Sequence, residues 1–273
     1  MRKKALVSWS SGKDSAWTLH VLRQSAEYEI VGLLTTINIA FDRVAMHGVR
    51  RELAEAQAAA AGLPLWKVPL PWPCSNEEYE AAMSAVCAKA IDAGVQVIAF
   101  GDLFLEDVRR YREERMRGLS LTPVFPLWKL ETRQLIRDMW EGGMRGRIVC
   151  LDPRKLPASF AGRDLDQTVV DEFPAGIDPC GENGEFHTFV YDGPMFAHAI
   201  PVRNGETVAR DGFVFTDLVM PEPAFVAEGT IKVNGWKGVR ISDSGDQSVK
   251  RSPWLGGCEI TRRRTVLDDG LLI

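Results

Sequence analysis

A serine-rich segment near the N-terminus carries the residue types that hold a phosphate group. Residues 10–15 read Ser-Ser-Gly-Lys-Asp-Ser, directly after the apolar run 5–9 and at the start of a helical pattern over 15–25. Small residues let backbone N–H groups approach an anion, and the helix start adds a partial positive charge. We therefore predict phosphate binding at this segment. The plainer alternative is a serine-rich turn in which Asp14 or Ser15 caps the helix.

The order of residues in this segment indicates which phosphate bond of a nucleotide is cleaved. It is not a Walker A loop, because that motif needs a glycine where Val7 stands and a Ser or Thr where Asp14 stands. The order S-S-G-K-D-S instead resembles the PP-loop of ATP pyrophosphatases, which cleave ATP between the α- and β-phosphates. Lys13 would neutralise the charge that develops on pyrophosphate, and Asp14 would hold Mg²⁺ directly or through water. The predicted nucleotide-binding residues are Ser10, Ser11, Gly12, Lys13, Asp14 and Ser15.

A second polar stretch runs over residues 178–188 and reads Asp-Pro-Cys-Gly-Glu-Asn-Gly-Glu-Phe-His-Thr. Its carboxylates can orient an amine or ammonia and accept its proton, and an imidazole can do the same near neutral pH. In a strand starting near Glu185, the side chains of Glu185 and His187 would share one face. Cys180 is expected to pack or orient rather than to attack, and the alternative for the whole stretch is a solvated loop with glycine turns. The predicted catalytic residues are Lys13, Glu182, Glu185 and His187.

Smaller candidates stand at the ends of other predicted elements. Asp102 follows an apolar strand, where it either contacts a ligand or caps the next helix. His47 precedes a helix and is as well placed for a pocket as for an ordinary turn. Arg109 belongs to a charged helical segment, 106–117, whose charges mostly face water, although Arg109 and Arg112 can point back at phosphates.

The pattern of apolar runs predicts an α/β fold. Up to about residue 175, short β-branched runs typical of strands buried on both faces alternate with helical segments. The expected strands are 5–9, 30–37, 95–100 and 147–151, with weaker candidates at 65–68 and 121–125. The expected helices are 15–25, 47–61, 77–93, 104–117, 131–142 and 162–173. This alternation predicts a Rossmann-like parallel sheet with helices on both sides and ligands at the carboxyl ends of its strands.

From about residue 186 the pattern becomes that of a small antiparallel meander. The expected strands are Phe186–Tyr191, Met195–Val202 and Glu206–Leu218. The dipeptides Asp192-Gly193 and Asn204-Gly205 would form the hairpin turns between them. We expect three parts, namely an α/β domain with the PP-loop over 1–175, a substrate-binding loop and β-meander over 176–220, and a C-terminal extension over 221–273.

Composition limits the remaining classes of protein. The 273 residues can bury one sizeable core with an appendage, and a net charge of -4 gives no basic field to recruit nucleic acid or an anionic membrane. Five widely spaced cysteines without a C-x-x-C pair argue against a disulfide framework, a zinc ribbon and an iron–sulfur site. The apolar run behind Arg2-Lys3-Lys4 is too short for a signal peptide, and no stretch approaches the roughly 18 apolar residues of a membrane span. We expect a cytoplasmic protein.

Together the two polar segments carry a family resemblance over about residues 4–220. SSGKDS, combined with CGENGEFHTF and the following YDGPMF, resembles the diphthine–ammonia ligase family of PP-loop ATP-binding proteins. The resemblance implies an adenine nucleotide α-hydrolase-like (HUP) fold with a small C-terminal β-rich part, and ATP and Mg²⁺ as the reaction's nucleotide and metal. It implies a ligase that adenylates a carboxylate, releases pyrophosphate and lets ammonia displace AMP to form an amide. The substrate-binding residues expected on this basis, together with the smaller candidates above, are His47, Asp102, Arg109, Cys180, Gly181, Asn183, Gly184 and Thr188.

The chain departs from the family's usual motifs at four positions. Ser11 replaces the middle glycine of S-G-G-K-D-S but keeps its N–H, so ATP binding is expected to survive. Against the G-E-G-G-E-Y-E-T usual in ligase-type members, Asn183, Phe186 and His187 replace glycine, tyrosine and glutamate. The F-H-T variant looks like the bacterial branch of the family. Bacteria lack diphthamide, so the acceptor carboxylate of this chain stays open.

Other functions and partners also stay open at this point. A PP-loop tRNA-modifying enzyme is disfavoured by the acidic net charge and the missing cysteine pairs. A nucleotide-binding protein without ATP cleavage is disfavoured because such a protein does not need the intact Lys13-Asp14-Ser15. The expected partners are ATP, ammonia or another amine, and a carboxylate on a small molecule or a protein. A homodimer is compatible with the sequence.

Overall fold

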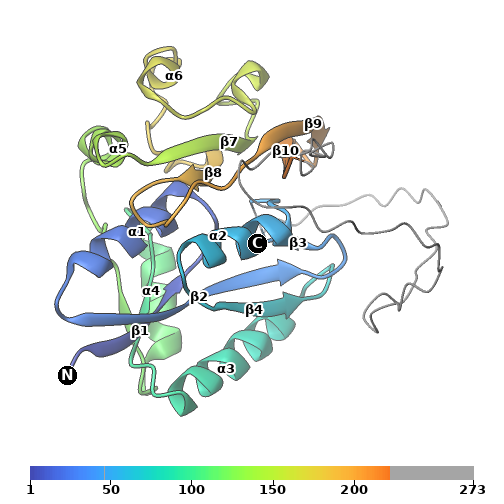
Figure 1. Cartoon of the computed structure of the whole chain (residues 1–273). Helices are drawn as coiled ribbons and strands as arrows, with labels where there is room; N and C mark the ends of the chain where they lie inside the picture. The colour runs from blue at the N-terminus through green and yellow to red at the C-terminus, as the bar shows by residue number, and fades with distance from the viewer. Residues whose placement is uncertain (46, 222–273) are drawn as a thin grey trace, which may run out of the picture. The chain divides into compact units, whose positions relative to one another are not determined.

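The computed structural model describes residues 1–45 and 47–221. Residues 1–222 form one compact unit. The C-terminal extension expected over 221–273 lies outside the described residues apart from Pro221. Within the described part of the chain the strands form two sheets, with helices packed around and between them (Figure 1).

The first sheet, sheet A, is the parallel sheet expected from the sequence. Its strands are β1 (Lys3–Ser8), β2 (Tyr28–Asn38), β3 (Arg43–Val44), β4 (Leu65–Leu70), β5 (Val97–Ala99) and β6 (Thr122–Val124). The order is β3-β2-β1-β5-β6, with β4 also paired to β2, and only the short β3 runs antiparallel. The chain runs outward from β1 to β2 and β4 on one side and to β5 and β6 on the other, so the strand order reverses beside β1. Ligands of open α/β sheets bind at such a reversal.

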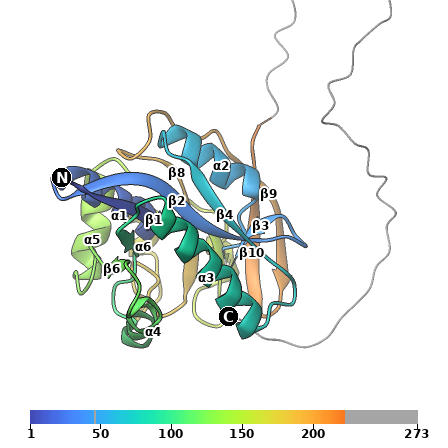
Figure 2. The same ribbon diagram turned by 90° about the horizontal axis from the view of Figure 1, so that it is seen from below.

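Helices cover both faces of sheet A, as its apolar strands require. The helices are α1 (Lys13–Gln24), α2 (Arg51–Ala60), α3 (Asn76–Asp92), α4 (Glu106–Met116), α5 (Thr132–Glu141) and the short α6 (Gln167–Asp171). Leu6 of β1 packs in the cluster that contains α3, and its neighbour Val7 packs in the cluster that contains α1. Figures 1 and 2 show α3 on one side of the sheet and α1 and α2 on the other. Alternate residues of β1 are therefore buried on opposite faces, which explains its unbroken apolar run.

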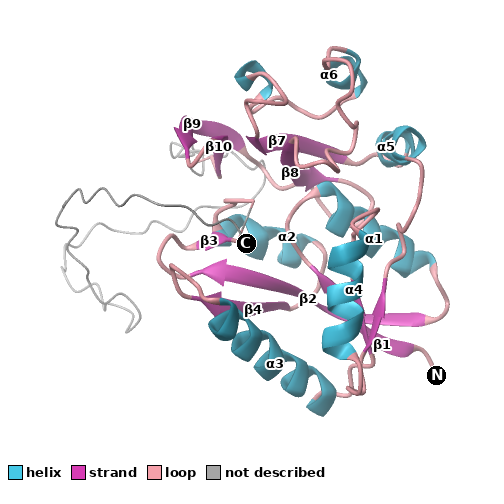
Figure 3. Cartoon of the chain, turned by 180° about the vertical axis from the view of Figure 1, so that it is seen from behind, coloured by secondary structure: helices cyan, strands magenta, loops and turns pink. Residues whose placement is uncertain are grey.

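The second sheet, sheet B, is antiparallel and lies beyond α1 and α2 (Figures 1 and 3). It contains β7 (Arg145–Leu151), β8 (Phe186–Asp192), β9 (Arg203–Arg210) and β10 (Phe213–Val219), in the order β8-β7-β10-β9. The strand expected over 147–151 as part of the parallel sheet is therefore a central strand of the antiparallel one. Ile148 and Val149 pack into different hydrophobic clusters. Burial on both faces, and not parallel pairing, accounts for the apolar run of β7.

The meander also differs from the expectation. Met195–Val202 is not a strand, because Met195 and Ile200 are buried in a crossing segment that hydrogen-bonds to α2 and β8. Asn204-Gly205 lies inside β9, and the hairpin turn is Asp211-Gly212, with φ of 53° and 80°. Positive φ at both central residues is the geometry of a type I′ turn, which Asn-Gly and Asp-Gly suit equally. Sequence alone therefore left the turn ambiguous.

Two helix expectations are also corrected. The helix expected over 162–173 shrinks to α6, because residues 162–165 run beside β7 and exchange backbone hydrogen bonds with Gly146 and Ile148. The helix expected from residue 47 begins at Arg51, which leaves His47 in a loop. Within the described residues, each helix is too short or too polar to cross a membrane.

Candidate functional site

The serine-rich loop joins β1 to α1 at the point where the strand order of sheet A reverses. The N-cap of α1 is Gly12, and the Lys13 N–H donates to Thr188 Oγ1 of β8 at 3.0 Å. Ser10 and Ser15 place their hydroxyl oxygens 3.3 Å apart, and Ser15 Oγ donates to the Gly12 carbonyl at 3.0 Å. The predicted nucleotide-binding residues thus form one compact loop at a helix N-terminus, the geometry that favours an anion.

Ser11 adopts the left-handed backbone conformation, with φ of 71°. It stands where the resemblance places a glycine, the residue that adopts this conformation without steric strain. The residue is fully buried, and its Oγ finds no hydrogen-bond partner within the described residues. Because Ser11 adopts a backbone conformation that favours glycine, contacts with other residues must hold its backbone in place.

Gln57 of α2 supplies that restraint, and sequence reasoning missed it. The residue is fully buried, and its Nε2 donates to Ser11 O at 3.0 Å and to Val190 O at 2.6 Å. Its Oε1 accepts from Trp9 Nε1 at 2.9 Å, and the Val190 N–H also donates to Ser11 O. One amide side chain therefore ties the loop to β8 of sheet B. The available signal was a lone glutamine on the alanine-rich face of a helix, which gives no chemistry by itself.

Lys13 is buried, with 4% of its surface exposed, between two carboxylates. Its Nζ lies 2.7 Å from Asp14 Oδ2 and 3.6 Å from Glu182 Oε1. Burial alone would lower the pKa of the Lys13 ammonium, but the charges of Asp14 and Glu182 outweigh it and raise the pKa. Burial also raises the pKa of Glu182, to about 7, against the opposing charge of Lys13. The cluster combines a fixed cation with a carboxyl group that titrates near neutral pH.

Glu185 does not join Lys13, Asp14 and Glu182 in that cluster. It is 2% exposed, and its carboxylate accepts hydrogen bonds from the backbone N–H groups of Asp178 and Asn183 and from Asn183 Nδ2. Burial alone would raise the pKa of Glu185, but these hydrogen bonds outweigh it and lower the pKa. The side chain therefore shapes the loop before β8, and its predicted catalytic role stays a prediction.

The other residues of this loop divide into two groups. Cys180 is 1% exposed, and its Sγ donates to Thr132 O at 3.4 Å, so it packs as expected, and burial raises the pKa of its thiol. Gly181 is buried beside it, and Thr188 caps α1. Asn183 and Gly184 are exposed, and the Asn183 amide is used by Glu185.

Two histidines lie beside the serine-rich loop. The rings of His47 and His187 stack with centroids 4.5 Å apart and an interplanar angle of 31°. His47 also approaches Gly12 so closely that a Cβ there would lie 2.8 Å from His47 Cε1. Burial and the positive charge of Lys13 lower the pKa of His187 to about 4. Burial and the neighbouring His187 likewise lower the pKa of His47, so both imidazoles are neutral at pH 7.

Asp102 lies on the other side of the loop, and Arg109 does not reach it. A Cβ at Gly101 would lie 2.8 Å from the carbonyl carbon of Asp14, so the segment that carries Asp102 packs directly against α1. Asp102 is held by Arg112, whose Nε donates to Asp102 Oδ2 at 2.8 Å. Arg109 instead places its guanidinium over the rings of Phe125 and Trp128.

A serine-rich loop that opens the first helix beside the switch point of a parallel sheet, with a buried lysine at the helix start, defines a nucleotide-binding α/β protein of the PP-loop type. The family model described as Diphthamide synthase N-terminal domain matches residues 2–122, and the model described as Diphthamide synthase C-terminal domain matches residues 131–218. The chain belongs to the diphthamide synthase family.

Curated relatives agree with this assignment. Proteins named diphthine–ammonia ligase from Homo sapiens and Danio rerio are each 26% identical over 241 residues. The alignments cover 80% of this chain and 89% and 92% of those proteins, respectively. A protein of the same name from Schizosaccharomyces pombe is 28% identical over 109 residues, which is 38% of this chain and 18% of that protein.

We expect Ser11→Gly to stabilise the fold. Glycine removes the side-chain strain of the left-handed conformation and an unpartnered buried hydroxyl, so the free energy of unfolding should rise by about 1 kcal/mol. Urea denaturation measures the change. Ser25→Gly is the contrasting control and should lower stability, because Ser25 has φ of -80° and its Oγ accepts a hydrogen bond from the Glu27 N–H. A Ser11→Gly protein less stable than the parent would show that the serine side chain itself supports the loop.

We expect Gln57→Glu to release the loop. A carboxylate of the same shape cannot donate to Ser11 O and Val190 O, so ATP affinity should fall at least about tenfold and unfolding free energy by about 2 kcal/mol or more. Isothermal titration with ATP and urea denaturation measure the two effects. Gln24→Glu on exposed α1 surface is the control. Unchanged ATP affinity in a folded Gln57→Glu protein would contradict the role given to Gln57.

Proposed function

We propose that this chain is an ATP-dependent ligase that joins a carboxylate and ammonia, or another amine, into an amide, with AMP and pyrophosphate as products. The single observation that carries the proposal is the buried Lys13 at the start of α1, set between Asp14 and Glu182 beside the serine-rich loop. A buried cation at a phosphate-binding helix N-terminus is suited to a leaving pyrophosphate. The names of the curated relatives support the same reaction class.

The first step would transfer AMP to the acceptor. An oxygen of the acceptor carboxylate attacks the α-phosphorus of ATP, the bond from that phosphorus to the bridging oxygen breaks, and pyrophosphate leaves with its electron pair. The loop N–H groups and the hydroxyls of Ser10 and Ser15 would bind the phosphates, and Lys13 would stabilise the charge that appears on the leaving group. Because Lys13 is buried, its charge acts with little screening by water.

The second step would form the amide. Ammonia attacks the acyl carbon of the mixed anhydride, AMP leaves, and one N–H proton must be removed. Glu182 is suited to accept that proton, because its pKa of about 7 matches the working pH of a general base. The neutral imidazole of His187, which lies near Lys13, can accept a hydrogen bond from the ammonia without adding charge.

A Mg²⁺ ion fits the donor set of this site through Asp14. Mg²⁺ is usually held by one or two carboxylates together with substrate phosphates, and Asp14 offers a carboxylate with 27% of its side chain exposed at the mouth of the loop. The ion would supply charge neutralisation on the phosphates when bound. Asp102 lies on a segment that packs against Asp14, but its carboxylate is already paired with Arg112.

The acceptor would bind beside the nucleotide site. The acceptor carboxylate is expected near Thr188, which accepts from the Lys13 N–H, and near Gly181, which precedes Glu182 in the chain. The reaction is expected in the cytoplasm, where ATP is available. His47, in the loop before α2, would form the wall of the acceptor site next to the serine-rich loop.

The products test the reaction class. With ATP, Mg²⁺, ammonium and cell extract, the full chain should form AMP and pyrophosphate, separated from ADP by ion-exchange chromatography. Lys13→Gln should lower this rate at least about a hundredfold, because the leaving-group charge is then unmatched. Lys67→Gln, an exposed lysine paired with Glu55, should leave it unchanged. ADP as the product would overturn the mechanism.

The pH profile tests Glu182. If its carboxylate is the base, the rate at a fixed concentration of free ammonia should rise as pH increases through about 7, and Glu182→Gln should give a low rate without that rise. The groups that face it are Lys13, Asp14, Asp178 and Cys180. A rate that rises through pH 7 in Glu182→Gln would assign the titration to another group.

The same pKa has a consequence for stability. A raised carboxyl pKa means that the folded protein holds the proton more tightly, so its contribution to stability is present below about pH 4.5 and is lost as pH rises through about 7. Glu182→Gln should remove that loss and gain about 3 kcal/mol relative to the parent between pH 4.5 and 8. Urea denaturation at the two pH values measures the difference, independently of activity.

A further inference from the structure

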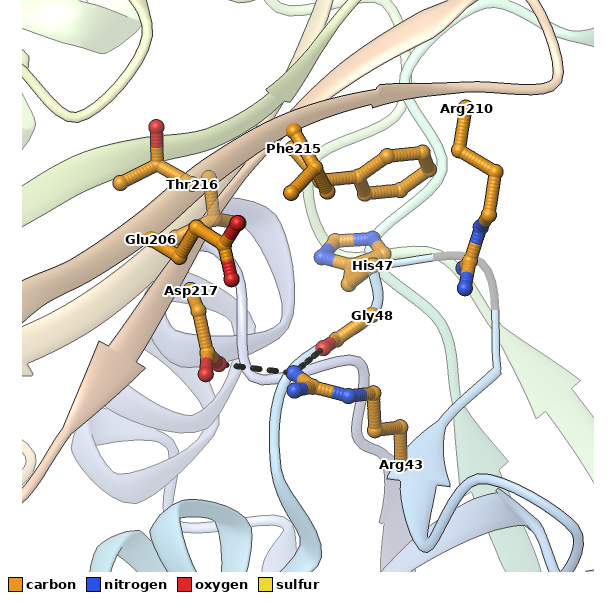
Figure 4. A pocket seen from close by; sticks show the side chains of 10 residues that line it. Arg43, His47, Gly48, Glu206, Arg210, Phe215, Thr216 and Asp217 are labelled. Atoms are coloured by element: carbon orange, nitrogen blue, oxygen red, sulfur yellow. Dashed lines mark hydrogen bonds and ion pairs between the residues drawn. The ribbon is translucent and has the colours of Figure 1, made fainter. Parts of the chain in front are cut away.

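A hollow of about 130 Å³ lies on the face of sheet B and is lined mostly by residues outside the site described above (Figure 4). Its floor is the β9–β10 hairpin, with Val208 and Phe215, and its wall is the loop that carries Arg43 and His47. His47 belongs both to this hollow and to the catalytic site, where it stacks on His187. The hollow is therefore adjacent to the proposed reaction centre.

The strand register places the hollow in line with His187. His187 of β8 pairs with Cys150 of β7, Cys150 pairs with Phe215 of β10, and Phe215 pairs with Val208 of β9. Residues opposite one another in an antiparallel sheet present their side chains on the same face. Because neighbouring strands are about 4.8 Å apart, Phe215 lies roughly 10 Å from His187 across this face.

On one wall of the hollow the charged residues are paired with one another. Arg43 donates to Asp217 Oδ1 at 2.8 Å and to Gly48 O at 2.6 Å, and Arg50 pairs with the same Asp217 carboxylate. These contacts brace the loop of Arg43 against β10. They leave Asp217 unsuited to a ligand cation, since two arginines already share it.

The other two charged residues of the hollow are available to a ligand. Arg210 holds its guanidinium 5.4 Å from the ring centres of both Phe41 and Phe215, and its ion pair is with Asp211 at an exposed turn, 3.4 Å away. Glu206 has no ion-pair partner among residues 1–45 and 47–221. Figure 4 shows Arg210 and Glu206 on either side of Phe215. The hollow thus offers one oriented cation and one carboxylate over an aromatic floor.

We propose that this hollow binds the head group of an α-amino acid, with its carboxylate at Arg210 and its ammonium at Glu206. The volume suits a head group of about five non-hydrogen atoms, since a cavity of about 150 Å³ holds benzene. The side chain of the ligand would extend past the ring of His47, which lines the hollow and stacks on His187, and end in the carboxylate that becomes amidated. The roughly 10 Å span favours a side chain longer than that of glutamate. This inference rests on the proposed ligase function for the fate of that second carboxylate.

Binding without ATP tests the hollow directly. L-2-aminopimelate carries the required groups, pimelate lacks the ammonium, and 6-aminohexanoate lacks the α-carboxylate. Isothermal titration of the full chain should show L-2-aminopimelate binding at least about tenfold more tightly than either analogue. Arg210→Gln and Glu206→Gln should each weaken its binding at least about tenfold, whereas Arg203→Gln, on the same strand outside the hollow, should not. Equal binding of the three compounds, or binding that ignores Arg210, would overturn the inference.

The failure of this inference is distinguishable from the failure of the ligase proposal. Binding of L-2-aminopimelate is measured without ATP, and formation of AMP and pyrophosphate is measured separately on the same protein. Binding that depends on Arg210 without AMP formation would uphold the hollow and overturn the ligase reaction. Formation of AMP and pyrophosphate with cell extract, together with no binding of L-2-aminopimelate, would uphold the ligase and overturn the hollow as its acceptor site.

Discussion

The carbonyl oxygen of Ser11 accepts hydrogen bonds from Gln57 Nε2 and from the Val190 N–H, and the site depends on this junction. Ser11 belongs to the loop after β1 of sheet A, and Val190 belongs to β8 of sheet B. A strained backbone conformation persists only where its surroundings over-determine it, and here a buried amide and a second sheet do so. The conformation of the loop and the position of sheet B are therefore set together.

The electrostatics of the site follow from that junction. Because β8 is fixed against the loop, Thr188 caps the start of α1 and the loop before β8 brings Glu182 to within 3.6 Å of Lys13. Glu185 holds this loop in shape with its own hydrogen bonds, so Glu182 needs no partner besides Lys13 to stay in place. Burial then raises the pKa of Glu182, while His187 stays neutral for the same reason.

The sequence predicted much of the fold because its strongest signals are local. The strands of sheet A other than the short β3, the helices α1 to α5 and the loop at residues 10–15 follow from periodicity and small residues. The assignment of β7 to the wrong sheet has a physical cause, since burial on both faces gives the same apolar run in a central antiparallel strand. Gln57 and the stacking of His47 on His187 depend on contacts between distant segments, and no local pattern marks them.

Two of the four substitutions that distinguish this chain's motifs, at positions 11 and 187, lie on either side of the same junction. At position 11 a serine tolerates the left-handed conformation because Gln57 and Val190 hold its carbonyl, so the phosphate-binding N–H groups keep their positions. At position 187 an imidazole stands where the family motif carries a glutamate. A carboxylate there would be a third negative charge around Lys13 and would push the pKa of Glu182 higher still. The neutral imidazole leaves one base that titrates near pH 7, and it stacks on His47, which also lines the hollow. Under the proposed function, the change at position 187 would therefore alter the acceptor and leave the ligase chemistry in place.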